Sequence, residues 1–318
     1  MMRILIMALI VSILASCATV PPLASDKRIA LTFDDIPRSP GAFLAEDERT
    51  DRIVEGLRRA KVDQAAFFLN PGNLDERPGA VQRIDRYVRA GHVIANHSAT
   101  HPHLNAVNAD AYLADIDAAE VWLAGRDGRR PWFRFPFLDE GGRDQVKRDA
   151  VRAGLDARGL INGYVTVDAS DWWLEQAAID ARKAGQTIDM EGLRILYIES
   201  HVEAAAFNDR MMRQVLGRAP IQVMLLHETD IAALWIADLV KALRADGWTI
   251  VSADEAYRDP IASLRPDVPS AQGTLSEAIA WERGAPAPRW YDRNDTRIYS
   301  RLFRERVLHL PTEEGPAR

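Results

Sequence analysis

The sequence contains very little cysteine: Cys17 is the only one among 318 residues. A fold held together by disulfide bonds is therefore excluded. Lysine and arginine form no block, and the formal net charge is −6, so we expect no nucleic-acid partner. The chain also lacks a glycine-rich phosphate loop and an internal repeat, which leaves nucleotide-binding folds and repeat architectures without support.

Long apolar runs are also scarce, and the clearest one is at the start of the chain. A short basic segment precedes an apolar core from Ile4 to Leu14. This run is too short to span a membrane as a helix and is typical of a secretory signal. We therefore expect the protein to be exported.

The segment Leu14-Ala15-Ser16-Cys17 resembles a bacterial lipobox. The resemblance implies a signal peptide over residues 1–16, a lipid on Cys17, a tether over residues 17–26 and membrane attachment through that lipid. With Ala18 after the cysteine, it further implies the outer membrane, facing the periplasm, in a Gram-negative host. The alternative is an ordinary signal peptide with an incidental cysteine.

From residue 27 onward, segments with strand character alternate with segments of helical periodicity. This alternation is typical of an α/β protein with a parallel sheet or a β/α barrel, whose active site lies at the carboxyl ends of the strands. The expected strands are 27–33, 64–69, 92–96, 132–135, 160–167, 221–226 and 249–251. The expected helices are 47–60, 81–90, 110–123, 143–153 ending at Gly154, and 231–245.

Two further regions complete the expected organisation. Residues 175–217 form a long, mostly helical segment between two of the strands. Proline becomes frequent after Asp259, and periodicity returns only at residues 296–310. We expect one domain over residues 27–258 and a C-terminal extension over 259–318 that wraps on it.

Side chains able to do chemistry follow the ends of five expected strands: Asp34 and Asp35, His97 and His101, Arg134, Asp168 and Asp171, and His227. Two imidazoles four residues apart and one carboxylate would form a three-ligand metal site with positions open for water, as in catalytic zinc sites. The second carboxylate of the aspartate pair would stay free to move a proton. We expect His92 and His103 to be structural.

Each of these residues also has a structural interpretation when taken alone. An aspartate pair after a strand is often a turn or a helix cap. Asp168 and Asp171 could cap the following helix, Trp172 could be core, and His227 could be a buried core histidine. The joint pattern therefore matters more than any single residue.

Taken together and in order, the five segments resemble the five motifs of the polysaccharide deacetylases, carbohydrate esterase family 4, also called the NodB-homology domain. They are Thr32-Phe33-Asp34-Asp35, His97-Ser98-Ala99-Thr100-His101, Arg134-Phe135-Pro136-Phe137, Asp168-Ala169-Ser170-Asp171-Trp172 and Leu225-Leu226-His227. The resemblance covers roughly residues 27–257. It implies a distorted β/α barrel of about seven parallel strands.

The resemblance also implies a role for each motif residue. Asp35, His97 and His101 would bind a divalent metal, most often Zn²⁺ with Co²⁺ or Ni²⁺ as alternatives. Asp34 would be the general base, paired with Arg134. His227 would be the general acid, held by Asp171. The substrate would meet the backbone N–H of Phe137 and an acetyl pocket walled by Trp172 and Leu225.

Three departures from the family pattern leave the substrate open. Ile36 replaces the usual glycine after the aspartate pair, Phe137 carries no phenol, and the segment before His227 is long. The resemblance implies a hydrolase that removes acetyl groups from an N-acetylated, or O-acetylated, glycan of the cell envelope. A cyclic-amide or formamide hydrolase of the same superfamily and a non-catalytic glycan-binding lipoprotein are the alternatives.

Overall fold

The computed structural model describes residues 26–311, so the predicted signal peptide and Cys17 lie outside the described residues. Parallel strands form one seven-stranded sheet in the order β6-β4-β3-β2-β1-β7, with β8 also pairing to β1. These strands are β1 (Arg28–Ile36), β2 (Ala66–Leu69), β3 (Val93–Asn96), β4 (Arg129–Phe133), β6 (Ile161–Asn162), β7 (Gln222–His227) and β8 (Thr249–Ile250). The expected α/β class with about seven parallel strands is confirmed.

The sheet curls until its two ends meet through one segment of chain. Residues 161 and 162 of β6 pair with β4, while Val167, a few residues later, forms a parallel bridge with Met224 of β7. The N–H of Leu225 donates to the carbonyl of Val167 at 2.9 Å. The result is a distorted barrel that this short, mostly irregular segment closes.

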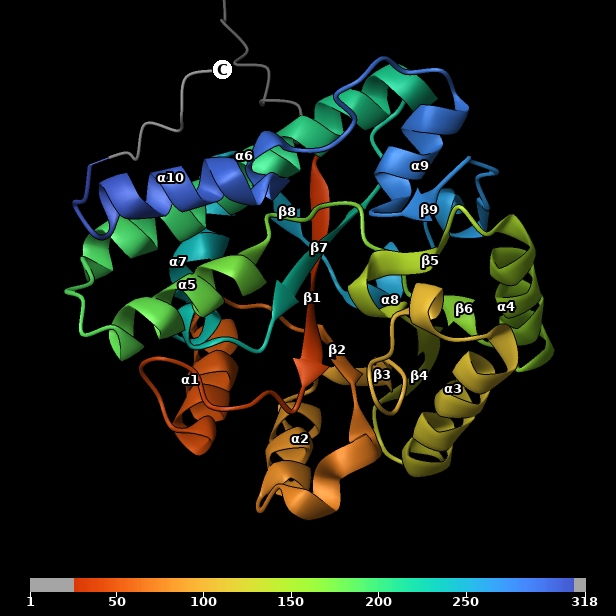
Figure 1. Ribbon diagram of the computed structural model, residues 1–318, viewed down its shortest axis with the longest axis horizontal. Helices are drawn as coiled ribbons and strands as arrows, with labels where there is room; N and C mark the ends of the chain where they lie inside the picture. Colours follow the sequence, from red (N-terminus) through yellow and green to blue (C-terminus); the bar gives the residue numbers. More distant parts are fainter. Residues whose placement is uncertain (1–25, 312–318) are drawn as a thin grey trace, which may run out of the picture.

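Helices cover the outside of the barrel, as Figure 1 shows around the central red strand β1. They are α1 (Glu46–Arg59), α2 (Ala80–Arg89), α3 (Ala109–Leu123), α4 (Gln145–Ala157), α5 (Asp171–Lys183), α6 (Met190–Leu216), α7 (Asp230–Ala245), α8 (Ala253–Ala256), α9 (Leu275–Glu282) and α10 (Thr296–Arg306). A small antiparallel pair, β5 (Asp139–Gly142) and β9 (Ala271–Gln272), lies beside the barrel. Among the described residues, no helix is long and apolar enough to cross a membrane.

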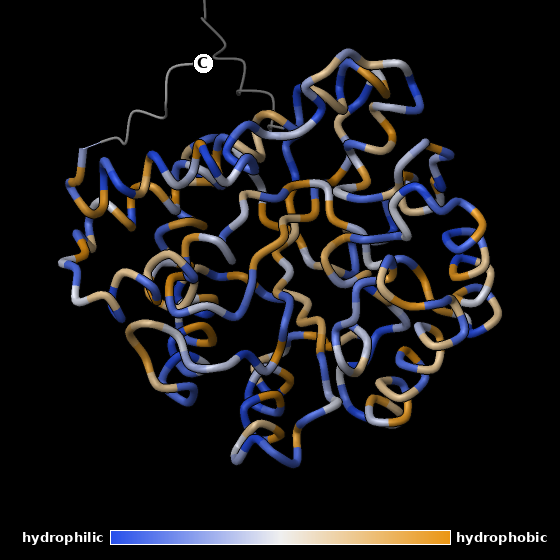
Figure 2. The backbone as a smooth tube through the Cα atoms, viewed as in Figure 1, coloured by the Kyte–Doolittle hydropathy of each residue, from blue (hydrophilic) through white to orange (hydrophobic). Residues whose placement is uncertain are grey.

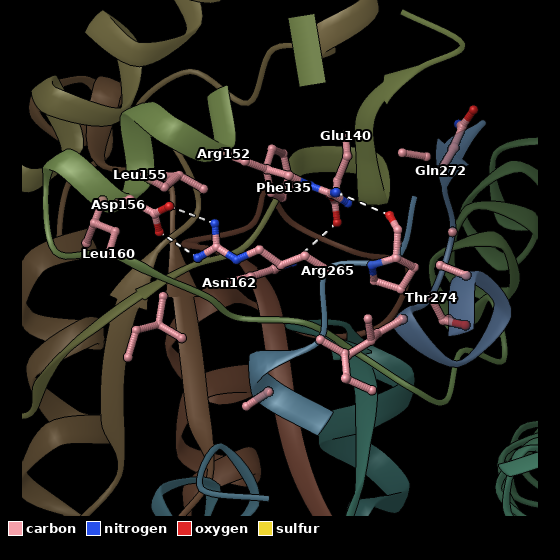
Figure 3. Close-up of a pocket in the computed structure, with 18 residues that line it drawn as sticks. Phe135, Glu140, Arg152, Leu155, Asp156, Leu160, Asn162, Arg265, Gln272 and Thr274 are labelled. Atoms are coloured by element: carbon pink, nitrogen blue, oxygen red, sulfur yellow. Dashed lines mark hydrogen bonds and ion pairs between the residues drawn. The ribbon is translucent and has the colours of Figure 1, made fainter. Parts of the chain in front are cut away.

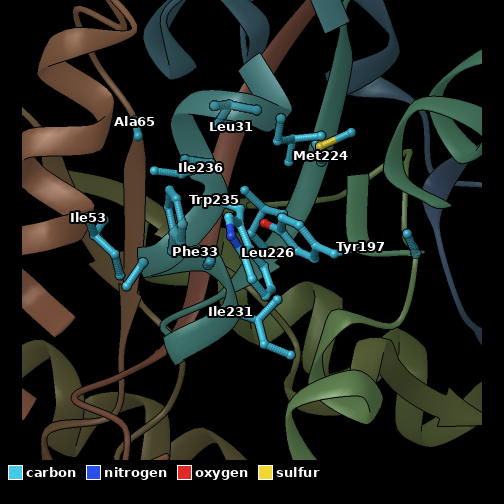
Figure 4. Packing of buried hydrophobic residues seen from close by; sticks show 14 of the residues in the cluster. Leu31, Phe33, Ile53, Ala65, Tyr197, Met224, Leu226, Ile231, Trp235 and Ile236 are labelled. Atoms are coloured by element: carbon cyan, nitrogen blue, oxygen red, sulfur yellow. The ribbon is translucent and has the colours of Figure 1, made fainter. Parts of the chain in front are cut away.

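Strand β1 divides the core because successive side chains of a strand point to opposite faces. Leu31 and Phe33 pack outward with Ile53 of α1 and Trp235 of α7, and the backbone through the middle of the molecule is correspondingly apolar (Figures 2 and 4). On the other face, Ala30 joins a separate cluster inside the barrel. The alternation brings Asp34 to the barrel interior, whereas Phe33 stays among the helices.

The boundary predicted for α4 was wrong, because the helix continues through Gly154 to Ala157. A Cβ atom at Gly154 would lie 2.6 Å from both methyl carbons of Leu113 in α3. The glycine therefore allows two helices to approach rather than ending one of them. The left-handed backbone that follows the helix belongs to Gly159, at φ +66°.

Two other predicted elements also differ in extent. The strand predicted over residues 160–167 is regular only at 161–162, because the chain there crosses from β4 to β7. The helical segment predicted over 175–217 consists of two helices, α5 and α6. They are separated near Gly185, which is at φ +70°, and Asp189 caps the second helix.

Residues 259–311 pack on the barrel through both of their helices. Leu275 and Ile279 of α9 belong to the same cluster as Ala30, which also includes residues of α6 and α8. Tyr299, Phe303 and Val307 of α10 belong to the outer cluster that includes α6. This extension also carries β9, which places part of it beside the functional site.

Candidate metal centre and active site

Asp35, His97 and His101 lie together at the carboxyl ends of β1 and β3. One ligand atom from each lies within 4.8 Å of the others. The Oδ1 atom of Asp35 is 3.1 Å from Nε2 of His101 and 3.6 Å from Nε2 of His97. These three atoms could hold one metal ion.

The backbone turns sharply at each end of this group. Asp35 is at φ +66°, so its side chain leaves the alternation of β1. His101 is at φ +59°, and its N–H donates to Oγ of Ser98 at 3.0 Å. Left-handed backbone at a non-glycine residue costs free energy, and such strain is concentrated at functional sites.

The hydrogen-bonding pattern leaves His97 and Asp35 each with an atom that can bind a cation. The carbonyl of Arg134 can only accept, so Nδ1 of His97, at 2.9 Å from it, carries the hydrogen. The lone pair of His97 is thereby left on Nε2, toward Asp35. Oδ1 of Asp35 is buried and makes no hydrogen bond within residues 26–311. A carboxylate oxygen in that condition, facing two imidazole nitrogens, fits a divalent cation.

The electrostatics of the centre also favour anionic Asp35. Burial by itself would raise the pKa of Asp35, but the neighbouring imidazoles of His101 and His97 lower that pKa well below its ordinary value. Arg38 donates to the other oxygen of Asp35 at 2.8 Å. Burial lowers the pKa of His101, which keeps its ring neutral and able to bind a metal.

Asp34 has different surroundings although it adjoins Asp35. Its carboxylate is buried inside the barrel, with Oδ1 2.5 Å from Nη1 of Arg134 and Oδ2 3.6 Å from Nε2 of His97. Asp34 therefore lies beside the candidate metal centre but is not among the three candidate ligands.

Arg134 is fully enclosed and holds several parts of the fold together. Its guanidinium donates to Asp34, to the carbonyl of Gly163 at 2.7 Å, to Oγ1 of Thr32 at 2.9 Å and to the hydroxyl of Tyr257 at 2.7 Å. Its plane also lies over the ring of Phe68, 3.8 Å from the centroid. A guanidinium with this many partners is held in one position and fixes the adjacent Asp34 carboxylate.

His227 and Asp171 form a second pair across the pocket. Nδ1 of His227 is 2.6 Å from Oδ1 of Asp171, whose other oxygen accepts the backbone N–H of His227 at 2.8 Å. Burial alone would lower the pKa of His227, but the charge and hydrogen bond of Asp171 outweigh it and raise that pKa to about 9. The imidazole is therefore protonated at neutral pH and leaves Nε2 as its remaining donor.

A pocket of about 420 Å³ joins these groups. Leu225 lines it from β7, Trp172 from the first turn of α5 and Phe137 from the turn after β4. Trp172 and Phe137 are 41% and 48% exposed, so both aromatic side chains are open to a ligand. Phe137 itself is at φ +57°.

Sequence reasoning missed residues that also line this pocket. His103 was expected to be structural, but it faces the pocket and stacks on Phe137 with ring centroids 3.5 Å apart. Arg38 and Gln272 line it as well. His103 lies two residues after the His97–His101 pair and could have been suspected. Gln272 lies in the C-terminal extension and gave no signal.

Two residues that the sequence analysis set apart make structural hydrogen bonds, His92 outside the pocket and Asp168 in its lining. His92 is buried at the start of β3, where its Nδ1 accepts the N–H of Ala65 at 3.2 Å. Asp168 lines the pocket, and burial raises its pKa to about 6. Its Oδ1 accepts the N–H of Ser170 at 2.7 Å, which shapes the turn before α5.

One family model matches part of the chain. Residues 23–157 match the family model described as polysaccharide deacetylase. A peptidoglycan-N-acetylglucosamine deacetylase of Bacillus cereus is 37% identical over 119 residues, which is 37% of this chain and 39% of that protein. A peptidoglycan-N-acetylglucosamine deacetylase of Listeria monocytogenes is 28% identical over 198 residues, 62% of this chain and 37% of that protein. The match thus spans about two fifths of the length of each relative.

Solved structures give weaker matches. A family 4 carbohydrate esterase from Streptomyces lividans, in complex with acetate, is 21% identical, with a TM-score of 0.48 over 73% of this chain and 96% of that one. A chitin deacetylase from Colletotrichum lindemuthianum is 19% identical, with a TM-score of 0.49 over 72% of this chain and 86% of that one.

Proposed function

We propose, on the premise that residues 23–157 are a polysaccharide deacetylase segment, that this protein is a metal-dependent hydrolase of acetylated glycans. The observation that carries the proposal is that three kinds of group line one pocket. They are the candidate metal ligands Asp35, His97 and His101, the buried carboxylate of Asp34, and protonated His227. The reaction is hydrolysis of an acetamide, in which water and the amide give acetate and a free amine.

Asp35, His97 and His101 would hold the divalent cation, with zinc favoured by two imidazoles and one carboxylate. Such a cation would polarise a carbonyl oxygen and lower the pKa of a bound water toward about 7. The unshared Oδ1 of Asp35 and the inward Nε2 of His97 support this assignment. Cobalt or nickel would suit the same donors.

Asp34 would act as the general base and accept a proton from the attacking water. Its ion pair with Arg134 supports this role, because the guanidinium orients the carboxylate and limits its motion. A general base contributes roughly 10²–10⁴-fold to the rate. Because Arg134 would act by holding Asp34 in place, it would be a positioning residue.

His227 would act as the general acid and donate its Nε2 proton to the leaving nitrogen. Its position across the pocket and its pKa of about 9 support this role. Asp171, held on Nδ1, would keep the proton-donating face toward the pocket.

The acetyl group would bind between apolar walls. Leu225 and Trp172 would contact its methyl, and the backbone N–H of Phe137 would donate to the oxygen that becomes anionic. A pocket of this volume with aromatic rims suits one sugar unit and its acetyl group.

Peptidoglycan is the substrate we favour, because the curated relatives named above act on its N-acetylglucosamine. The lipobox-like segment at Cys17 would anchor the enzyme in the envelope, on the periplasmic side of the outer membrane, within reach of that polymer. Labelled palmitate should enter the wild-type protein and not Cys17→Ser. Equal labelling of both would contradict the anchor.

Acetate release tests the proposed activity. Chito-oligosaccharides, peptidoglycan and acetyl-xylan would each be incubated with protein stripped by chelator and with the same protein after zinc is returned. We expect release from the N-acetylated glycans only after zinc addition. Release from acetyl-xylan alone would assign an O-acetyl esterase, and no release from any substrate would contradict the proposal.

A further inference from the structure

A pocket of about 590 Å³ lies between the last turns of α6 and residues 283–288, which follow α9. Phe207, Met211 and Val215 supply apolar side chains from α6, and residues 283–288 form the other side. Figure 1 shows this region at the top of the view, where the chain after α9 runs back along α6 toward α10. Among the described residues, none lines both this pocket and the catalytic pocket.

Two exposed tryptophans flank residues 283–288. Trp281 lies in α9 and is 38% exposed, and Trp290 follows the segment and is 47% exposed. The guanidinium of Arg289 lies 4.9 Å from the centroid of the Trp281 ring and donates to the carbonyl of Ala285 at 3.0 Å. Tryptophan is enriched at membrane interfaces, because its ring is apolar and its N–H is polar.

The same surface carries positive charge that the protein does not neutralise. Arg210 and Arg283 line the pocket and are exposed, and neither makes an ion pair within the described part of the chain. No carboxylate lines this pocket among the described residues, and Glu282 accepts a backbone N–H from the segment before β9 at 2.9 Å. By contrast, the exposed Arg265 pairs with Asp156 of α4 at 2.6 Å (Figure 3).

These two cations differ in sign from the chain as a whole, whose formal net charge is −6. A surface of negative charge would therefore repel most of the molecule and attract this one region. The combination of exposed tryptophans, prolines and unpaired arginines is typical of a surface that meets lipid headgroups.

This region lies at the amino ends of the strands that carry the catalytic groups. Helix α6 leads into β7, and Arg213 of α6 donates to Asp26, just before β1, at 2.8 Å. Asp34 lies near the other end of β1, and the nine residues of that strand span roughly 30 Å. In Figure 1 the arrowhead of β1 likewise points away from α9.

The proposed lipid anchor would reach this region. Residues 18–25 join Cys17 to Asp26, and a chain of that length spans at most about 30 Å when fully extended. A lipid on Cys17 would thus hold the amino end of β1 near the bilayer. The catalytic end would then face away from the membrane, toward the glycan.

We propose that this region, the α6–α9 face, rests on a lipid bilayer that contains anionic headgroups. The face consists of the exposed side chains of residues 207–215 and 281–290. Its tryptophans and prolines would enter the interfacial layer, and its arginines would contact lipid phosphates. The inference goes beyond the proposed function, because it assigns a surface that needs no catalytic activity. A second copy of this chain is the competing occupant.

Vesicle binding tests the proposal. The mature chain without its lipid, residues 18–318, keeps every residue that the structure describes. It would be sedimented with vesicles of phosphatidylcholine alone and with vesicles of phosphatidylcholine and phosphatidylglycerol in equal parts. We expect stronger binding to the anionic vesicles, which weakens as the salt concentration is raised.

Substitutions on the face should weaken that binding. Arg210→Ala and Arg283→Ala should each reduce the partition coefficient on anionic vesicles about fivefold, the effect of one basic residue near such a surface. Arg265→Ala is the matched control, because it removes the same charge outside the face and should leave the partition coefficient unchanged. Trp290→Ala should weaken binding to both kinds of vesicle.

A fluorescent label tests which surface meets the lipid. Cys17 is the only cysteine of the sequence, so Ala287→Cys and Val146→Cys each give residues 18–318 a single labelling site. Both positions are exposed, and Val146 lies in the first turn of α4, directly after β5. An environment-sensitive label should shift to shorter wavelength on anionic vesicles at Ala287→Cys and not at Val146→Cys.

The outcomes separate this inference from the proposed function. No binding to anionic vesicles, binding that Arg210→Ala and Arg283→Ala leave unchanged, or equal shifts at both labels would overturn the α6–α9 face. A dimer in analytical ultracentrifugation that Trp290→Ala dissociates, without vesicle binding, would assign the face to a second copy and also overturn it. Zinc-loaded protein that released no acetate would count against the hydrolase alone.

Discussion

At the scale of single residues, the carboxylates of Asp34 and Asp35 lie in different surroundings although the two residues are adjacent in the chain. Asp34 continues the inward face of β1 and meets Arg134, whereas the left-handed backbone at Asp35 turns the next carboxylate toward two imidazoles. The two side chains should therefore respond differently to substitution.

We expect Asp34→Asn to lower kcat by about 10²–10⁴-fold while zinc remains bound, because the amide cannot accept the proton of water. His101→Ala should lose zinc, since one of the three proposed ligands is removed. Metal analysis after dialysis, together with acetate release, checks both. Asp34→Asn protein that turned over at the wild-type rate would contradict the assignment of the base.

The second residue-scale prediction concerns His227. Because Asp171 holds the pKa of His227 at about 9, the acid form persists through neutral pH. Asp171→Asn should shift the alkaline limb of kcat/KM from near pH 9 to about pH 6.5 or below. NMR titration of the ring in the metal-free protein gives the same pKa without turnover. An unchanged limb in the variant would show that another group sets it.

Much of the candidate site could be predicted at this scale, because its residues lie at or just after the carboxyl ends of strands whose apolar runs are plain in the sequence. Asp34, His97 and His227 each follow such a run, and parallel strands bring their carboxyl ends together. The inward roles of Tyr257 and Gln272 could not be predicted. Tyr257, directly after α8, contacts Arg134, and Gln272 lines the pocket from the extension. Both contacts depend on how distant parts of the chain fold together, which no local pattern encodes.

At the scale of elements, the presence of a helix or strand was easier to predict than the residues at which it begins and ends. The buried strands and the amphipathic helices were recognisable from their periods. The end of α4 was missed because a glycine can mark either a helix end or a close approach of two helices. Gly192 in α6 is a second glycine that allows two helices to approach closely.

A Cβ atom at Gly192 would lie 2.2 Å from the backbone oxygen of Arg306, at the end of α10. We expect Gly192→Ala to reduce the free energy of unfolding by about 1–3 kcal/mol, although alanine is the better helix former by about 1 kcal/mol. Urea denaturation measures the change. The adjacent exposed substitution Glu191→Ala should stay within about 0.5 kcal/mol. A more stable Gly192→Ala protein would show that α10 does not pack tightly on α6.

At the scale of the whole molecule, the titrating groups predict where the fold is most stable. Burial raises the pKa of Glu175 to about 7 and of Glu277 to about 8. A carboxyl with a raised folded pKa stabilises below its ordinary pKa, and this contribution is lost as pH rises through the folded value. The contribution of His227 is present below its ordinary pKa and is lost as pH rises through about 9.

The lowered pKa values of Asp35 and Asp171 act in the opposite sense, because their contribution disappears as pH falls. The free energy of unfolding of the metal-free protein should therefore be highest near pH 5 and fall toward pH 9. Denaturant titrations across this range check the slope. Glu277→Gln should flatten it between about pH 5 and 8, since the amide does not titrate. An identical slope in that variant would contradict the assignment of Glu277.

The buried Asp34–Arg134 pair has a consequence for how this protein can change over generations. Removing either partner would strand an uncompensated charge inside the barrel, at a cost of about 3–5 kcal/mol. Asp35 and His101 sit nearer solvent and can be lost with less damage to the fold. Under the proposed function, a lineage that drifted away from catalysis would thus lose Asp35 and His101 before it lost the inner ion pair.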